Sequence, residues 1–388
     1  MDTLGYTEYS TLTLNGNKFA TYVKDTTVYH VYWLASTQEL NAVISYDQVL
    51  PERQAALTNG NAPVITQLHG NSSNGLCFII ELDDGSFIIF DGGYADNTNE
   101  EVIYNFLAHE NDRQDGILIR AWILTHSHGD HYGAFHDFAN SDYADLVTLM
   151  HVYYSPLNVE SDYFNTTFKT DLAGFEGATG VVLHMGMSFN LRNLKMEVLM
   201  TPDELYIDGN QADSNNSSVV VRLVDANGYS MIFLADTAAE LGDKLVAEYG
   251  TALRSDMCQV AHHGYESSKQ SLYEAIGVVS TAPTNGDKYV RYLWYPCSAS
   301  IYCAADGTST DGLGTMRERN TAVLEFLEAS VAKRLMPTKL GQSFSPLNSS
   351  TGKTYSWLSN FMLKNYQLQG YPQMVWGSNS VSFVTSLS

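Results

Sequence analysis

The pattern of hydrophobic and polar residues divides the chain into short strands separated by polar turns. Residues 1–60 alternate between apolar and polar positions with period 2, as in Thr27–Trp33, which predicts a small β-rich extension. A polar segment ending in Pro63 follows and is a plausible boundary. We therefore expect two parts, a β-rich N-terminal extension over residues 1–60 and a larger domain over residues 61–388.

Strands and helices alternate within the larger part. Hairpins are predicted where apolar runs flank short polar turns, at residues 76–90, 187–200 (turning at Arg192-Asn193) and 217–234. Ile117–Leu124 predicts a buried strand, and a short strand is expected at residues 256–260. Helices are predicted at residues 100–110, from residue 132 onward, and at residues 238–249 and 318–335. This alternation indicates an α/β or α+β protein whose sheets are covered by helices.

Composition limits the partners of this protein. With 388 residues, 44% of them hydrophobic, the chain can bury a substantial core. Its formal charge of −22 and its lack of any Lys/Arg-rich run argue against long nucleic acids, because neutralisation of phosphates supplies much of their affinity for proteins. A small or short oligomeric substrate fits this charge better. The oligomeric state is not predicted by any feature of the sequence.

Membrane and cysteine signals are weak. No stretch approaches the roughly 18 apolar residues of a membrane span. The first residues do not show the basic and then apolar segments of a signal peptide, so we expect a cytoplasmic protein or a secreted one whose signal peptide has been removed. Of four cysteines, Cys297 and Cys303 are near enough in sequence to close a small loop, and a bridge or two free thiols both remain open.

The segment Thr125–His131 carries the strongest chemical signal in the chain. His126 and His128 lie at i and i+2 on an extended turn after a buried strand, so both can face one ion. Asp130 and His131 follow on the next half-turn and can face a second ion. Imidazole and carboxylate together suit Zn²⁺, with Mn²⁺ or Fe as alternatives. We therefore predict a site for two divalent metal ions.

Two other strand ends carry matching residues. Asp236 follows the apolar strand at residues 231–234, where its carboxylate can bridge two ions, although it could also cap the next helix. His262 and His263 follow the strand at residues 256–260. Because adjacent side chains diverge, we expect one of them to bind metal and the other to support a ligand or contact substrate.

These motifs resemble the metallo-β-lactamase fold superfamily over roughly residues 63–300. The resemblance rests on Asp91-Gly92-Gly93, on Thr-His-x-His-x-Asp-His, on Asp236 and on the final His. The segments 215–220, 234–236 and 260–264 are most similar to the β-lactamase-like domain of bacterial DNA-uptake competence channels, and bacterial phosphorylcholine esterases share a similar ending.

The resemblance implies an α/β fold, a four-layer αββα sandwich with a small β-rich N-terminal extension, and a dinuclear metal-dependent hydrolase. By position, His126 and His128 would hold one ion and Asp130 and His131 the other. Asp236 would bridge the two ions, and His263 would complete the second site.

One ligand of the family pattern is missing. The superfamily usually supplies a third His to the first ion after a hairpin, but residues 199–203 contain none. If Arg192-Asn193 is a two-residue turn, counting outward places His184 opposite Thr201, so His184 could reach the first ion from the other strand. A first site with only two His and the bridging Asp is the main alternative. Asp203 or Glu204 is a third.

Two ions that share Asp236 would also share a water, and each lowers the pKa of that water, so a metal-bound hydroxide becomes available near neutral pH. Asp130 would orient this nucleophile, and His262 or Tyr265 would donate a proton to the leaving group. The resemblance favours a phosphoester, above all a phosphodiester, as the substrate. The same hydroxide could instead attack a lactone, thioester or β-lactam. The missing His also leaves open a non-catalytic binding module that retains the fold.

Overall fold

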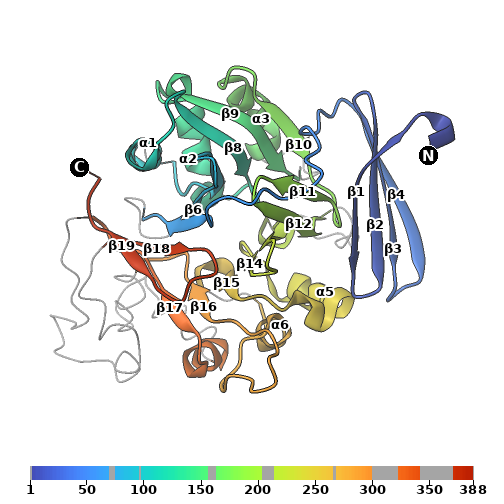
Figure 1. Cartoon of the computed structure of the whole chain (residues 1–388), viewed down its shortest axis with the longest axis vertical. Helices are drawn as coiled ribbons and strands as arrows, with labels where there is room; N and C mark the ends of the chain where they lie inside the picture. Colours follow the sequence, from blue (N-terminus) through green and yellow to red (C-terminus); the bar gives the residue numbers. More distant parts are fainter. Residues whose placement is uncertain are drawn as a thin grey trace.

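Two β-sheets stacked face to face form the centre of the protein (Figure 1). The computed structural model describes residues 2–69, 75–95, 98–155, 163–202, 214–264, 268–298, 322–340 and 370–387. A third, smaller sheet built from the N-terminal residues lies at one side of this pair.

The first large sheet has eight strands in the order β10-β9-β8-β7-β6-β5-β18-β19. Their bounds are Val64–Gln67 (β5), Cys77–Glu81 (β6), Phe87–Asp91 (β7), Ile117–Ile123 (β8), Val147–Tyr154 (β9), Thr179–Val182 (β10), Tyr371–Val375 (β18) and Ser382–Val384 (β19). Strands β7 to β10 are parallel to their neighbours in that run. The carboxyl ends of β7 and β8 therefore meet at one edge, which places Asp91 beside the segment that follows β8.

The second large sheet has seven strands in the order β11 to β17. Their bounds are Ser188–Leu191 (β11), Leu194–Met200 (β12), Val220–Asp225 (β13), Ser230–Phe233 (β14), Met257–Gln259 (β15), Tyr292–Trp294 (β16) and Lys333–Leu335 (β17). Leu191 pairs with Leu194, as the two-residue turn predicted. Strands β14 to β17 run parallel, so the loops after β14 and β15 leave the sheet at the same edge.

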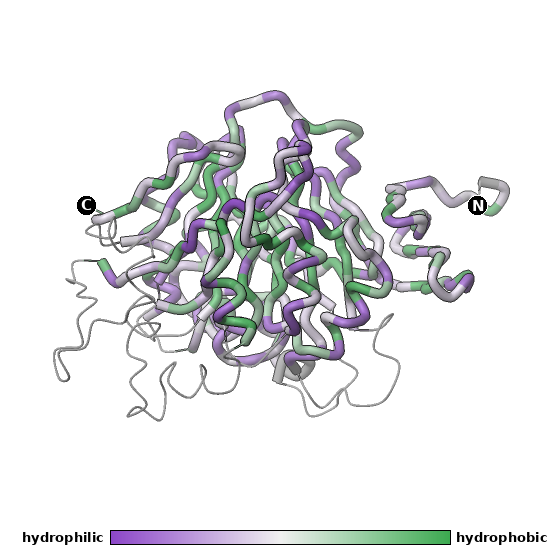
Figure 2. The backbone as a smooth tube through the Cα atoms, turned by 90° about the horizontal axis from the view of Figure 1, so that it is seen from below, coloured by the Kyte–Doolittle hydropathy of each residue, from purple (hydrophilic) through white to green (hydrophobic). Residues whose placement is uncertain are grey.

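Helices cover the outer faces of both sheets, which confirms the predicted αββα sandwich. Their bounds are Asn99–Glu110 (α1), Gly129–Ala139 (α2) and Tyr163–Ala173 (α3) on the first sheet, and Ala239–Tyr249 (α5) and Gln270–Ile276 (α6) on the second. Alternation along β7 explains the layers, because Ile88 and Phe90 face the second sheet whereas Phe87 and Ile89 face the helices. Figure 2 shows the resulting concentration of hydrophobic residues at the centre.

Short 3₁₀ turns complete the described elements. They comprise Asp2–Leu4, Ala144–Leu146, Ser214–Ser217, Gly250–Leu253 and Ala261–Gly264. The last of these contains both histidines that follow β15, so its backbone determines where their side chains point.

The N-terminal residues form the predicted β-structure, an antiparallel sheet in the order β1-β2-β3-β4. Its strands are Thr7–Leu14 (β1), Asn17–Lys24 (β2), Thr27–Leu34 (β3) and Glu39–Ser45 (β4). Phe19 and Tyr32 belong to the same buried cluster as Leu245 and Tyr249 of α5. Because this sheet shares a core with the sandwich, a domain boundary at residue 60 stays a prediction.

The C-terminal half of one predicted helix is wrong. Residues 322–329 are helical, but Lys333–Leu335 forms β17 and pairs in parallel with β16. Leu335 is fully buried in this pairing, so a tertiary contact prevails over the helical pattern of the segment.

Two other sequence signals can be followed only in part. No helix within the described ranges is long and apolar enough to cross a membrane. Cys297 is buried, and Cys303, with which it could form a bridge, lies outside the described residues.

Candidate metal centre

The end of β8 and the start of α2 carry the first four candidate ligands. His126 follows β8 after the buried residue Thr125, and His128 is the N-cap residue of α2 with extended backbone angles. Asp130 and His131 therefore lie on the first turn of the helix. The strand end and the helix start turn all four side chains toward one edge of the sandwich.

Glycines let α2 approach the sheet closely enough for this. A Cβ atom on Gly92 would lie 3.0 Å from the Cβ of Ala134, and one on Gly133 would lie 2.2 Å from the backbone N of Ala95. The backbone N–H of Ala134 donates to the carbonyl of Gly93 at 2.8 Å. Gly92 and Gly133 therefore allow α2 to pack closely beneath the ligands.

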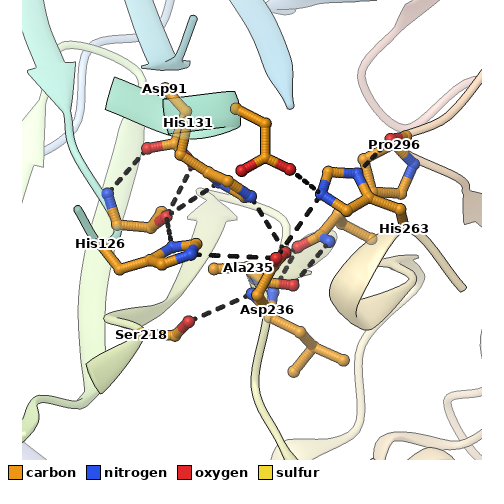
Figure 3. A network of polar contacts seen from close by, with 12 residues as sticks. Asp91, His126, His131, Ser218, Ala235, Asp236, His263 and Pro296 are labelled. Atoms are coloured by element: carbon orange, nitrogen blue, oxygen red, sulfur yellow. Dashed lines mark hydrogen bonds and ion pairs between the residues drawn. The ribbon is translucent and has the colours of Figure 1, made fainter. Parts of the chain in front are cut away.

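Asp236 enters from the second sheet, three residues beyond the end of β14. It is 1% exposed, and its backbone N–H donates to Ser218 Oγ at 3.2 Å (Figure 3). The N-cap residue of α5 is Ala238, and no side chain caps that helix end. The alternative role of Asp236 as a helix cap is therefore not realised.

His262 and His263 are presented by an unusual stretch of backbone. They have φ values of +49° and +55°, and Gly264 follows at +87°. Three consecutive left-handed residues send the two imidazoles apart, as expected for adjacent residues. His263 is 1% exposed, and its Nδ1 contacts the carbonyl of Pro296, whereas His262 is partly exposed.

Asp236 is shared by two groups of potential metal ligands (Figure 3). The larger group contains Asp130, His131, Asp236 and His263, and the smaller contains His126, His128 and Asp236. In the larger group, His263 Nε2 lies 3.0 Å from Asp130 Oδ2 and 3.5 Å from Asp236 Oδ2, and His131 Nε2 lies 3.1 Å from Asp236 Oδ1. Two ligands of a tetrahedral ion with bonds of about 2.0 Å lie roughly 3.3 Å apart, so these separations fit one cation.

The hydrogen bonding of these atoms supports the same interpretation. His126 Nε2, His131 Nε2 and Asp236 Oδ1 are buried, yet none has a partner in hydrogen-bonding geometry among the described residues. Buried polar atoms without such a partner are costly and rare. A cation coordinated by these atoms would satisfy all three, so the residues fit divalent metal ions.

Asp91 supports the larger group from behind. Its Oδ2 lies 2.7 Å from His131 Nδ1, and its two oxygens also accept hydrogen bonds from the backbone N–H and hydroxyl of Thr125. A carboxylate on the far nitrogen fixes the tautomer and orientation of a ligating His. In the sequence, Asp91 stood out only as the first residue of the Asp91-Gly92-Gly93 motif. Its position at the end of an apolar strand, like that of Asp236, was the available signal.

Electrostatic coupling is strong in this cluster. Burial alone would raise the pKa of Asp236, but His131 and His263 hold it well below its usual range. Burial opposes the charged form of His131, yet Asp236 and Asp91 raise its pKa well above the usual range, and Asp236 and Asp130 similarly raise the pKa of His263 to about 10. Burial and the neighbouring His131 keep the pKa of His126 low. Such mutual perturbation is typical of functional sites.

Gln259 holds the two loops of the second sheet together. Its buried side chain accepts from the backbone N–H groups of Leu234 and Ala235 and donates to the carbonyls of Ala235 and Val260. Because all four bonds of the amide are made, the loop carrying Asp236 is fixed against the loop carrying His263. Sequence reasoning did not single out this residue.

His184 is not brought into either group. A turn at His184–Met187, with Gly186 at φ +87°, ends the hairpin pairing before His184 can face Thr201, and Met185 N–H donates to Thr201 Oγ1 instead. His184 Nε2 lies 2.8 Å from Ser45 Oγ of β4. Its ring stacks on that of His30 with centroids 6.1 Å apart.

Of the remaining predicted residues, only His262 lies within the described part of the chain. His262 Nε2 lies 3.8 Å from Asp236 Oδ2, at the open side of the cluster. Tyr265, Asp203 and Glu204 lie outside the described residues.

Known proteins resemble this chain in sequence and in fold. Residues 71–207 match the family model described as the metallo-beta-lactamase superfamily. Among solved structures, the metallo-beta-lactamase fold protein YhfI from Bacillus subtilis is 13% identical over 68% of this chain and 93% of that chain, with a TM-score of 0.40. CmlA, a diiron beta-hydroxylase from Streptomyces venezuelae, is 11% identical over 72% and 53%, with a TM-score of 0.39. A diphosphatase from the PhnP family is 12% identical over 60% and 85%, with a TM-score of 0.36. At these scores the structures carry no further argument, and no curated protein matches the sequence.

The αββα sandwich and its His/Asp cluster define a protein of the metallo-β-lactamase fold. The match to the metallo-beta-lactamase superfamily model covers residues 71–207, about a third of the chain, and agrees with this fold. The match ends before Asp236 and His263, so these two candidate ligands rest on the geometry of the site. Membership of the competence-channel or phosphorylcholine-esterase branch stays a prediction.

Proposed function

We propose that this protein is a dinuclear metal-dependent hydrolase. One cation would be held by Asp130, His131, Asp236 and His263, and the other by His126, His128 and Asp236. The observation that carries the proposal is the fully buried carboxylate of Asp236, which lies within reach of both His groups. When bound, two such cations would lower the pKa of water enough to supply a nucleophile near neutral pH and would stabilise negative charge that develops on the substrate.

The residues of the chain would position this chemistry. Asp91 fixes the ring of His131, and the carbonyl of Pro296 does the same for His263. Asp130 is partly exposed and hydrogen-bonded by His263, so its free carboxylate surface can orient the attacking water. Because the other ligands of this group are buried and only the carboxylate of Asp130 is accessible, a substrate would approach from the side of Asp130.

His262 is the described residue best placed to donate a proton to the leaving group. Its side chain is 25% exposed, and its Nε2 lies 3.5 Å from Asn215 Nδ2 as well as near Asp236. We assign the proton donor to Nε2 of His262, with Tyr265 as the alternative from the sequence.

We propose a phosphoester, most of all a phosphodiester, as the substrate. Two cations that share a carboxylate are suited to in-line displacement, because one can stabilise the attacking oxygen and the other the leaving oxygen. The net charge of −22 favours a small ester or a short oligonucleotide over a long polyanion. Zinc fits the His and Asp ligands of both groups, and the two-His, one-carboxylate set of the smaller group also suits iron.

The test is a metal and substrate screen on the full chain. Protein loaded with Zn²⁺, Mn²⁺ or Fe²⁺ is assayed with bis-p-nitrophenyl phosphate, nitrocefin and a lactone panel, with metal content measured in parallel. The proposal expects two cations per chain and turnover of the phosphodiester. Turnover of nitrocefin or a lactone alone would support the proposed hydrolase activity but rule out a phosphoester as the substrate. Fewer than two cations without any turnover would favour the non-catalytic binding module.

A further inference from the structure

A cavity lies away from the metal centre, where the β11–β12 turn meets residues 51–54. Its volume is about 300 Å³, and it is bounded by β8 and β9 of the first sheet, by the β11–β12 turn of the second, and by residues 51–54. Arg120 of β8 lines this cavity, and six residues of extended chain, about 20 Å, separate it from His126. The cavity therefore does not belong to the metal centre.

Residues 51–54 form one wall of the cavity and are attached to the second sheet. Asn190 Nδ2 donates to the carbonyl of Gln54 at 2.8 Å, and Gln54 Nε2 donates to the carbonyl of Arg192 at 2.6 Å. These bonds keep the segment in place at the mouth of the gap between the sheets. The cavity is thus a built feature of the place where residues 51–54 cross the edge of the two large sheets.

Three arginines from distant segments line the cavity, although the protein as a whole carries a charge of −22. Arg120 Nη2 lies 2.7 Å from Asp84 Oδ2, and Arg192 Nε lies 3.0 Å from Asp83 Oδ1. These two aspartates hold the guanidinium groups in place and offset part of their charge. Arg53 is exposed at the rim beside Glu52. The lining offers oriented N–H donors to a negatively charged ligand.

Tyr153 supplies an independent sign of a missing partner. Its side chain is fully buried, it lines the same cavity, and its hydroxyl has no hydrogen-bond partner among the described residues. An unsatisfied buried hydroxyl costs free energy, and a ligand oxygen in the cavity would remove that cost.

We propose that this cavity binds a small organic anion through a carboxylate or phosphate group. The anion accepts hydrogen bonds from Tyr153 Oη and Arg192 and is attracted by Arg53, while its organic part contacts Met150 and Leu191. A volume of about 300 Å³ corresponds to a compact metabolite, at the small end of ligand pockets. This site is separate from the hydrolase proposal and does not depend on it.

The test uses the metal-loaded full chain and three probes: inorganic phosphate, malonate and its uncharged analogue malonamide. Calorimetric titration is carried out with the wild type, Arg53→Ala and Tyr153→Phe. Both variants should weaken the binding of phosphate or malonate about tenfold, since each removes a contact to a charged group. Malonamide should not bind. Tyr153→Phe should also melt at a higher temperature than the wild type without ligand, because it removes only the unsatisfied hydroxyl.

Arg254→Ala is the matched control, because it removes one positive charge at an exposed position outside the lining of the cavity. Binding that responds equally to Arg53→Ala and Arg254→Ala would reflect net charge and overturn the proposal. Anion binding that survives both cavity variants but is lost in His263→Ala would belong to the metal centre, with the same consequence. A lower melting temperature for Tyr153→Phe would show that the hydroxyl has a structural partner and would also overturn it.

Discussion

The two candidate metal groups share Asp236 but differ in how their other ligands are held. In the larger group, His131 and His263 are buried and each is fixed from behind, by Asp91 and by the carbonyl of Pro296. In the smaller group, His126 is buried beside Thr125, whereas His128 is partly exposed at the start of α2. His131 and His263 are already held in place before a cation binds, so they lose less freedom on binding than the more exposed His128, and the larger group has one ligand more. We therefore expect the larger group to hold its cation more tightly.

The largest effect is expected from Asp236→Ala, because this carboxylate belongs to both groups. The smaller group, left with two ligands, should lose its cation, and the larger group, left with three, should bind its cation more weakly. Hydrolysis should fall by roughly a thousandfold or more, since metal ions supply several kcal/mol of transition-state stabilisation. Metal analysis and turnover measurements check this. Asp243→Ala, an exposed acidic residue of α5, is the control and should change neither quantity. If Asp236→Ala still bound two cations as tightly as the wild type, Asp236 would not be a ligand.

Single-ligand variants separate the two groups. His128→Ala leaves two ligands in the smaller group, so the metal content should fall from two cations to one per chain. His263→Ala leaves three ligands in each group, so both cations should be released over a similar range of chelator concentration. Competition with a chromophoric chelator measures both. If His263→Ala kept one tightly bound cation and lost the other, the smaller group would be the tighter one, which contradicts the expected order of affinities.

Acid should weaken the junction with the N-terminal sheet. Burial and the neighbouring His184 lower the pKa of His30 to about 4, against a hydrogen bond to the carbonyl of Met185. The unfolded state, with a pKa near 6.5, binds more protons between these values, so the free energy of unfolding falls as the pH drops from about 6.5 to about 4. The loss attributable to His30 is about 3 kcal/mol. Urea denaturation at several pH values should show a shallower decline for His30→Asn. Parallel curves for both proteins are the contrary result.

Asp91→Asn should weaken the larger group alone. The amide occupies the same space but lacks the negative charge that orients and polarises His131. Loss of such a supporting carboxylate typically costs 10- to 100-fold in metal affinity or activity, and we expect about that change. The chelator competition should show weaker binding of one cation only. An equal loss of metal affinity at both groups would mean that Asp91 supports the structure of both groups and not His131 alone.

The smallest effect is expected from His184→Gln. Because His184 contacts Ser45 and His30, metal affinity should change by less than about threefold. Metal content at limiting Zn²⁺ is the measurement. A drop to one cation per chain would place His184 in the smaller group, as counting along the hairpin suggested.

The elements and the metal cluster differ in how far the sequence predicts them. The layers follow from local patterns, because alternation along segments such as Phe87–Asp91 and Ile117–Ile123 specifies which residues face each layer. Leu191 and Leu194 show that even register can be predicted where a two-residue turn fixes it. Lys333–Leu335 shows the limit, because its strand form depends on a distant partner strand.

Within the site, the dense cluster at His126–His131 is visible in sequence because its residues are neighbours. The supporting roles of Asp91 and Gln259 arise only when separate strand ends meet. His184 illustrates the same limit from the other side. The hairpin register was right, but a turn at Gly186 ends the pairing before it reaches His184 and Thr201.

The left-handed backbone at Ala235, His262 and His263 has a consequence for how the protein responds to its surroundings. Each such residue disfavours the folded chain by roughly 1–2 kcal/mol. A cation that binds only the folded form would restore stability in proportion to the logarithm of its free concentration. The fraction of folded protein would therefore rise and fall with the concentration of free metal. When metal is scarce, less protein stays folded, in addition to fewer metal sites being filled.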